Sequence, residues 1–136
     1  KDLSGNGGGF CFDCRGILNP GRIEEYKSQT GKDIAVQEFL ENQTKMPDFL
    51  NGIKSVISIT IEDYLERNFE NLQINFGCTG GQHRSVYSAE KIAEFVKKQY
   101  PQVCVSITHD EQPQLSDGYS RATSSSLFIG FYFSFG

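Results

Sequence analysis

A strand–helix–strand alternation in the second half of the chain constrains the fold more than any other feature. Residues 72–77 (LQINFG) alternate apolar and polar side chains and end in glycine, which predicts a strand. Residues 86–100 then place apolar side chains on one helical stripe that Pro101 ends, and residues 103–108 (VCVSIT) predict another strand. Such alternation implies right-handed crossovers. We predict one α/β domain over residues 1–136, with a mostly parallel central sheet and flanking helices.

The first half of the chain predicts one strand, a turn and two helices. FCFDCR at Phe10–Arg15 is typical of a strand, and GILNPGR, at Gly16–Arg22, of a turn at its carboxyl end. A short helix is predicted to begin near Asp33, with the Asp33 carboxylate as its cap. From Pro47 to Arg67, apolar residues recur at steps of three and four, which predicts one buried helix face: Leu50, Ile53, Val56, Ile57, Ile61, Tyr64 and Leu65.

The segment GCTGGQHRS, at Gly77–Ser85, lies between a predicted strand and a predicted helix. Such a loop exposes backbone N–H groups at the positive end of the helix dipole, and paired glycines let a ligand approach the backbone. Hydroxyl, imidazole and guanidinium groups add donors that suit phosphate oxygens. The alternative is a turn whose polar side chains only cap the helix. The predicted phosphate-binding residues are Thr79, Gly80, Gly81, His83, Arg84 and Ser85.

The spacing of Cys78 and Arg84 allows a catalytic alternative. A cysteine, five residues and an arginine resemble the signature loop of cysteine-dependent phosphatases. That resemblance implies that the thiolate attacks phosphorus and that the arginine binds the phosphoryl oxygens. Gly77 stands where those enzymes usually carry histidine, and only Asp13 and Asp110 are candidates for the general acid. A cysteine that packs beneath the loop is the other interpretation of Cys78.

Composition limits the partners of the chain. The net charge of −4 disfavours a strong nonspecific grip on nucleic acid, which depends on many lysines and arginines. Cys11 and Cys14 form a C-x-x-C, but no second ligand pair has metal spacing, so we predict neither a metal site nor a cofactor. The four cysteines do not suggest a disulfide framework, which favours a reducing cytoplasm. The apolar run at residues 127–136 is too short to span a bilayer.

Three segments together resemble the C-terminal domain of the RapZ family, the bacterial RNase adapter proteins. GCTGGQHRSV is similar to that family's GCTGG segment followed by HRSV, FDCRGILNPG to its FD-x-R strand and NP turn, and TGKD at Thr30–Asp33 fits between them. The similarity extends over about residues 9–108. It implies a domain that binds glucosamine-6-phosphate and that in some members presents small RNAs to an endoribonuclease.

The resemblance also implies roles for individual residues. It implies that the ligand pocket uses Thr79, Gly80, Gly81, His83 and Arg84, with Cys78, Asp13, Arg15 and Asn19 as weaker candidates whose other role is hydrogen bonding at turns and strand ends. Gly21 stands where some members have histidine, so one sugar contact is missing. No G-x-x-x-x-G-K-[ST] sequence is present, and the basic tail linked to RNA contact is absent. We therefore expect neither ATP nor GTP binding, and RNA binding becomes the lesser interpretation; a protein partner or homo-oligomer remains open.

The last residues of the chain resemble the beginning of the family's domain. That domain ordinarily starts with a strand ending in SFG or SFS, whereas here SSSLFIGFYFSFG comes last. This order suggests a circular permutation in which residues 127–135 form the family's first strand, beside Phe10–Arg15. Residues 113–126 would then be a linker. An unrelated tail, or a chain whose segments are numbered out of order, are the alternatives.

Overall fold

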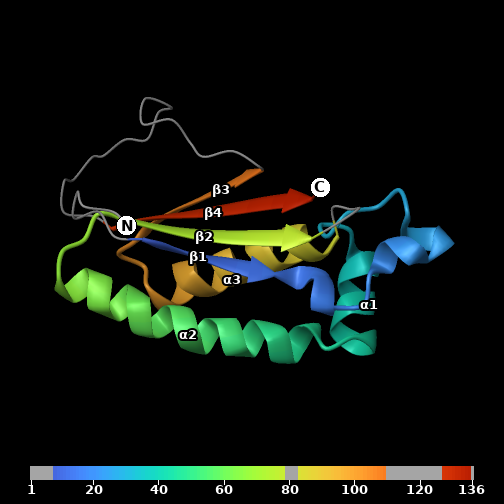
Figure 1. Ribbon diagram of the computed structural model, residues 1–136, viewed down its shortest axis with the longest axis horizontal. Coiled ribbons are helices and arrows are strands. Elements are labelled where there is room, and N and C mark those ends of the chain that lie inside the picture. The colour runs from blue at the N-terminus through green and yellow to red at the C-terminus, as the bar shows by residue number, and fades with distance from the viewer. Residues whose placement is uncertain (1–7, 79–82, 110–126, 136) are drawn as a thin grey trace.

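A computed structural model describes residues 8–78, 83–109 and 127–135 of the chain. Its four described strands form one parallel sheet in the order β1-β2-β4-β3 (Figure 1). The α/β fold predicted from the alternating elements is therefore confirmed. The strands are β1 (Gly9–Asp13), β2 (Asn71–Cys78), β3 (Cys104–His109) and β4 (Phe128–Phe135).

The predicted neighbour of the last strand was wrong. β4 lies between β2 and β3, and β1 is an edge strand paired to β2. A central position suits the composition of β4, because Ile129 and Phe131 are fully buried and both flanking strands satisfy its backbone. Pairing between parallel strands is set by packing across the whole sheet, which the sequence of one strand does not reveal.

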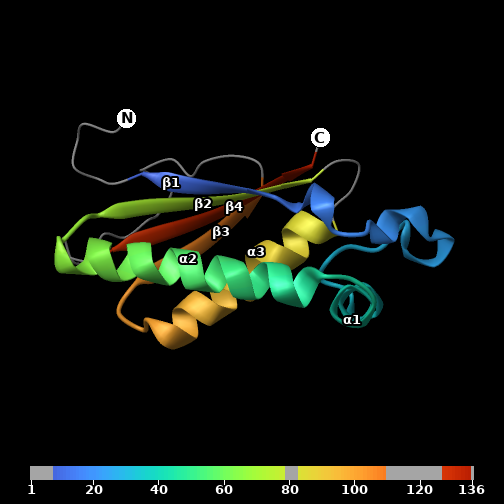
Figure 2. The same ribbon diagram turned by 60° about the horizontal axis from the view of Figure 1, so that its bottom comes forward.

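Three helices in the described part of the chain accompany the sheet: α1 (Ile34–Gln43), α2 (Met46–Glu66) and α3 (Arg84–Gln99). Both α2 and α3 lie against the same face of the sheet, and α1 lies near the carboxyl ends of the strands (Figures 1 and 2). Three short 3-10 turns connect β1 to α1: η1 (Cys14–Gly16), η2 (Pro20–Arg22) and η3 (Glu24–Tyr26). The flanking helices thus leave the opposite face of the sheet without a helix among the described elements.

The long helix α2 has the predicted buried face with one exception. Leu50, Ile53, Ile57 and Ile61 are buried, but the Val56 side chain is 47% exposed. Val56 lies one position before Ile57, so it is rotated by about 100° from the centre of the stripe. Its assignment to the core was therefore wrong.

The cap predicted for α1 was also wrong in detail. Asp33 is the residue before the helix, but its side chain makes no capping hydrogen bond. The Asp33 carboxylate instead accepts a hydrogen bond from the backbone N–H of Thr30 at 2.7 Å. Asp33 therefore closes the preceding turn, and the Thr30 hydroxyl completes that turn by accepting from the N–H of Lys32 at 3.0 Å.

The core fills the space between the helices and one face of the sheet. Leu72, Ile74 and Phe76 alternate along β2 and are buried, and the rings of Phe76 and Phe131 stack with centroids 6.5 Å apart. Burying one such side chain stabilises the fold by roughly 1.5–3 kcal/mol. Hydrophobic packing on this face therefore fixes the position of α3, whose first turn follows the loop after β2.

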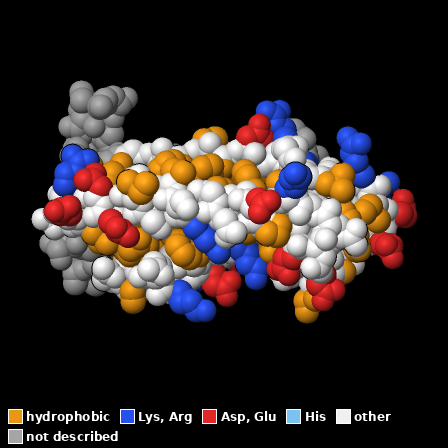
Figure 3. All heavy atoms as spheres, turned by 90° about the horizontal axis from the view of Figure 1, so that it is seen from below, with side chains coloured by type: hydrophobic (Ala, Val, Ile, Leu, Met, Phe, Trp, Pro, Cys, Tyr) orange, Lys and Arg blue, Asp and Glu red, His pale blue; other side chains and the backbone are white. Residues whose placement is uncertain are grey.

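The helical face of the molecule has mixed charge. Lysine and arginine side chains are interspersed with aspartate and glutamate, and hydrophobic side chains are visible between them (Figure 3). This face carries no large area of one sign. In the described part of the chain, no helix combines the length and apolar character needed to cross a membrane.

Candidate functional site

The two sequence segments proposed to form a pocket meet at one end of the sheet. β1 and β2 are parallel neighbours, and Asp13 at the end of β1 pairs in register with Gly77 near the end of β2. The turn after β1 and the start of α3 consequently lie together at the carboxyl ends of these strands (Figure 1). This end is where ligands of parallel α/β sheets usually bind.

Hydrogen bonds from the Arg84 side chain connect the first turn of α3 to the turn after β1. This side chain is buried, and Nη1 donates to the carbonyl oxygens of Ile17 at 2.8 Å and Arg15 at 3.3 Å. A planar guanidinium suits this role because several donors project in a fixed geometry. Arg84 therefore holds the two segments in register, a role that the sequence did not predict.

His83 makes a second connection to the same region. The ring is 3% exposed, and Nε2 lies 2.8 Å from the carbonyl oxygen of Tyr26. Because a carbonyl only accepts, Nε2 carries the proton and donates. Nδ1 is buried without a hydrogen-bond partner among the described residues. The donor nitrogen is thus already used within the protein, whereas the sequence suggested that His83 donates to phosphate.

Two glycines allow the segments to approach this closely. A Cβ atom on Gly31 would lie 2.4 Å from the carbonyl oxygen of His83 and 2.5 Å from the backbone nitrogen of Tyr87. A Cβ atom on Gly21 would lie 3.3 Å from Cε1 of His83. A histidine at position 21 would have to pack against the His83 ring, so the family's alternative residue needs a different arrangement here.

Asp13 and Arg15 form the exposed part of the site. Arg15 Nη2 lies 2.7 Å from Asp13 Oδ2, and the two side chains are 62% and 57% exposed, respectively. Hydrogen bonds from the side chain and backbone of Arg15 lower the pKa of Asp13 from 3.8 to about 2, and the charge of Arg84 contributes further. Asp13 is therefore a carboxylate at neutral pH, and Arg15 presents a cation beside it.

Comparison with known proteins matches most of the chain to one family. The family model described as the RapZ C-terminal domain matches residues 4–113. The chain belongs to the RapZ C-terminal domain family. No solved structure gives a significant match to it.

Curated relatives of this RapZ C-terminal domain carry the name "Nucleotide-binding protein". The one from Endomicrobium trichonymphae is 40% identical over 92 residues, which are 68% of this chain and 32% of the relative. The one from Fervidobacterium nodosum is 41% identical over 101 residues, covering 74% and 35% of the two chains. The one from Thermosipho africanus is 37% identical over 91 residues, covering 67% and 33%. The matched part spans about a third of each relative.

Other candidate residues of the RapZ C-terminal domain have structural contacts. Asn19 Oδ1 accepts from the N–H of Gly21 at 2.8 Å and caps η2, and the Ser85 side chain is fully buried in the first turn of α3. Cys78 is the last residue of β2. Thr79, Gly80, Gly81 and Asp110 lie outside the described residues, as does the predicted linker at residues 113–126.

Sequence reasoning missed two residues that shape this end of the RapZ C-terminal domain. Tyr26 supplies the carbonyl that fixes His83, and Gly31 packs on the first turn of α3. The sequence did contain a signal for Gly31: the TGKD segment matches the family pattern, and no role had been assigned to it. Nothing in the sequence indicated Tyr26, because it contributes its backbone carbonyl and every residue type has one. Among the described residues, no three His, Cys, Asp or Glu side chains gather closely enough to hold a metal ion.

Proposed function

We propose that this chain is a noncatalytic sensor or adapter domain that binds a small phosphorylated sugar, such as glucosamine-6-phosphate. The observation that carries the proposal is the contact of Arg84 with Ile17, which joins the turn after β1 to the amino end of α3. The 16-residue helix α3 directs its positive end toward this junction. A phosphate group suits that position because backbone N–H groups and the helix dipole both favour an anion.

The proposed ligand contacts divide between a phosphate subsite and its rim. The phosphate subsite comprises the segment Thr79–Gly81 together with the backbone N–H groups of His83, Arg84 and Ser85, while the side chains of His83 and Arg84 hold the turn after β1 in place. Arg15 is the exposed cation of the rim, and Asp13 can accept hydrogen bonds from sugar hydroxyl or amino groups. Cys78 and Asn19 are retained as weaker candidates.

The name of the curated relatives does not by itself assign a nucleotide site to this chain. Those proteins are called nucleotide-binding, and this chain corresponds to about a third of their length. The chain contains no Walker sequence G-x-x-x-x-G-K-[ST]. We therefore propose a phosphosugar rather than ATP or GTP as the ligand of this part.

The phosphatase alternative is weakened by the ionisation of Asp13. A general acid must carry a proton at the working pH, whereas Arg15 holds the pKa of Asp13 at about 2. Turnover of a generic aryl phosphate that disappears in Cys78→Ser would restore this alternative. Activity that persists in the variant would show that Cys78 is not the nucleophile.

The RNA alternative is weakened by charge. The chain has a net charge of −4, and the helical face mixes both signs (Figure 3). Retention of a structured small RNA that falls steeply as salt rises would support it. Absence of retention even at low salt would exclude it for this chain.

A cytoplasmic location is also a proposal. The described cysteines Cys11 and Cys104 are free thiols, which is the usual state in a reducing compartment. Measuring their reactivity in cells with a membrane-permeant thiol reagent tests this, because extensive prior oxidation would contradict it.

We also propose that the order of segments is circularly permuted relative to the family. The family match ends at residue 113, yet β4 is a central strand of the sheet. A linear comparison misses a strand that has moved from one end of the chain to the other.

Reordering the gene tests the permutation. A chain that begins at Leu127, continues through Gly136 into Lys1 and ends at residue 112 should unfold cooperatively, with stability similar to the original chain. Moving the same ten residues, with an equal linker, into the exposed helix end near Arg67 is the control. A reordered chain that fails to fold would contradict the permutation.

Calorimetry tests the proposed ligand. Glucosamine-6-phosphate, glucosamine and inorganic phosphate are titrated into wild type and two matched variants, Arg15→Gln and Arg67→Gln. Both arginines are exposed and paired with an aspartate, at 2.7 Å and 2.8 Å, but Arg67 ends α2 at the opposite end of the sheet. We expect Arg15→Gln to weaken binding about tenfold and Arg67→Gln to leave it unchanged. Absence of binding to wild type would refute the sensor proposal.

A further inference from the structure

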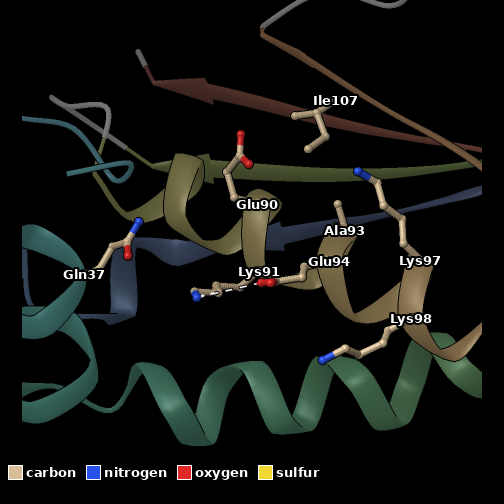
Figure 4. Close-up of a pocket in the computed structure, with 8 residues that line it drawn as sticks. All are labelled: Gln37, Glu90, Lys91, Ala93, Glu94, Lys97, Lys98 and Ile107. Carbon is tan, nitrogen blue, oxygen red and sulfur yellow. Dashed lines mark ion pairs between the residues drawn. The ribbon is translucent and has the colours of Figure 1, made fainter. Parts of the chain in front are cut away.

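A groove lies on the outer side of α3, away from the junction at Arg84. Two hollows of about 510 and 360 Å³ share the side chains of Lys91, Glu94 and Lys98, so they adjoin. We call them together the α3 groove. Its first hollow extends from α1 to β3 (Figure 4), and its second, lined by Leu50 and Lys54, extends to α2.

The glutamates of the α3 groove already have partners. Glu90 pairs with Lys32 at 3.5 Å, and Glu94 pairs with Lys91 at 3.8 Å, the contact drawn as a dashed line in Figure 4. The carboxylate of Glu41 accepts a hydrogen bond from the hydroxyl of Tyr87 at 2.7 Å. None of these carboxylates lies within ion-pair distance of the remaining lysines among the described residues.

Three lysines of the groove have no carboxylate within ion-pair distance among the described residues: Lys54, Lys97 and Lys98. Lys97 points toward Ile107 of β3, whereas Lys98 points toward α2 (Figure 4). Lys97 and Lys98 also lie in the last turn of α3, where they complement the helix dipole. Lys54 lies in the middle of α2, so the dipole does not account for it.

The floor of the groove is apolar and holds one lysine in place. Leu50 and Phe95 line the second hollow, and Ala93 and Ile107 line the first. The ammonium of Lys54 lies 5.3 Å from the centre of the Phe95 ring, a cation–π contact that keeps the charge at the edge of the apolar floor. An apolar floor rimmed by cations is complementary to apolar side chains flanked by carboxylates.

We propose that the α3 groove binds a peptide segment of a partner protein in which acidic residues flank apolar ones. The apolar side chains pack on Phe95 and Ile107, and the carboxylates pair with Lys54, Lys97 and Lys98. A nucleic acid is the poorer occupant because Glu41, Glu90 and Glu94 stand among the lysines and would repel a continuous row of phosphates, whereas a peptide can place separate carboxylates opposite the lysines alone. This inference is independent of the phosphosugar proposal, because the groove shares no residue with that site.

Selection from a random peptide library tests the proposal. The full chain is the bait, and the enriched peptides are measured by fluorescence anisotropy against Lys54→Glu/Lys98→Glu. The control is Lys27→Glu/Lys45→Glu, which makes the same change in net charge at exposed lysines outside the groove. We expect enrichment of acidic–apolar sequences, a loss of affinity of about tenfold or more in the groove variant, and less than about twofold in the control.

Three outcomes would overturn the proposal. One is the absence of any enriched class of sequences. Another is an equal loss of affinity in both double variants, which would indicate attraction to net charge alone. The last is binding of a single-stranded RNA oligonucleotide that the groove variant abolishes and the enriched peptides do not displace. Circular dichroism of both variants confirms that each remains folded.

Discussion

Arg84 Nη1 and the carbonyl oxygen of Ile17 lie 2.8 Å apart, although 67 positions separate them in the chain. The bond ties the amino end of α3 to the turn after β1, and both partners are buried. The sequence predicted Arg84 as a phosphate ligand, but its main role in the structure is to hold the turn after β1 against α3. Its removal affects folding before it affects binding.

Arg84→Met should destabilise the fold strongly. The substitution keeps an apolar stem of similar length but leaves the carbonyl oxygens of Ile17 and Arg15 without their donor. We expect the free energy of unfolding to fall by about 3 kcal/mol, measured by urea denaturation. Arg67→Gln, at an exposed pair, should cost less than about 1 kcal/mol. Equal effects of the two substitutions would contradict the supporting role of Arg84.

Gly31→Ala should also destabilise the fold, whereas Gly52→Ala should not. The Cβ atom on Gly31 would collide with the backbone of His83 and Tyr87, while a Cβ atom on Gly52 in α2 would meet nothing within 4 Å beyond its chain neighbours and the backbone of its own helix. We expect a loss of about 2 kcal/mol or more for Gly31→Ala and a gain of up to about 1 kcal/mol for Gly52→Ala. Thermal denaturation of both variants measures this. An unchanged melting temperature in Gly31→Ala would mean that the turn does not pack on α3 as described.

The carboxyl group of Asp13 should titrate at unusually low pH. Its pKa falls from 3.8 to about 2 in the folded state, so the pair with Arg15 stabilises the fold above about pH 4. That contribution is lost as the pH falls from about 4 to 2, where Asp13 becomes protonated. NMR titration of the side-chain carboxyl carbon measures the pKa directly. In Arg15→Gln the pKa should rise toward 3.8; an unchanged value would show that Arg15 is not the cause.

Tyr87→Phe should loosen the contact between α1 and α3. The Tyr87 hydroxyl donates to Glu41 at 2.7 Å, and burial and this bond raise the pKa of Tyr87 above its ordinary value. Removing the hydroxyl should cost about 1 kcal/mol in chemical denaturation. Ultraviolet titration of the wild-type chain tests the raised pKa, since Tyr87 should remain neutral at a pH where exposed tyrosines ionise. A chain in which every tyrosine ionises together would contradict the contact.

The sequence was sufficient to predict the elements in which apolar residues recur with a regular period. The stripe of α3 and the alternation of β2 give helix and strand unambiguously, because each period exposes one face to the core. Val56 and the neighbours of β4 escaped prediction because burial at the edge of a stripe and pairing in a parallel sheet depend on distant elements. For the site, residue type indicated an anion but not the partners of Arg84 and His83. Both side chains bond to backbone carbonyls, and those acceptors are invisible in the sequence.

The most direct test of the phosphosugar site is an NMR titration of the isotopically labelled chain with glucosamine-6-phosphate. We expect saturable shifts of the backbone amides of Arg15, His83 and Ser85, at the carboxyl ends of β1 and β2. The amides of residues 67–71, at the opposite end of the sheet, should not move. Shifts confined to those residues or to the α3 groove, or no saturable shift at all, would contradict a sugar-phosphate site at the junction of β1 and α3.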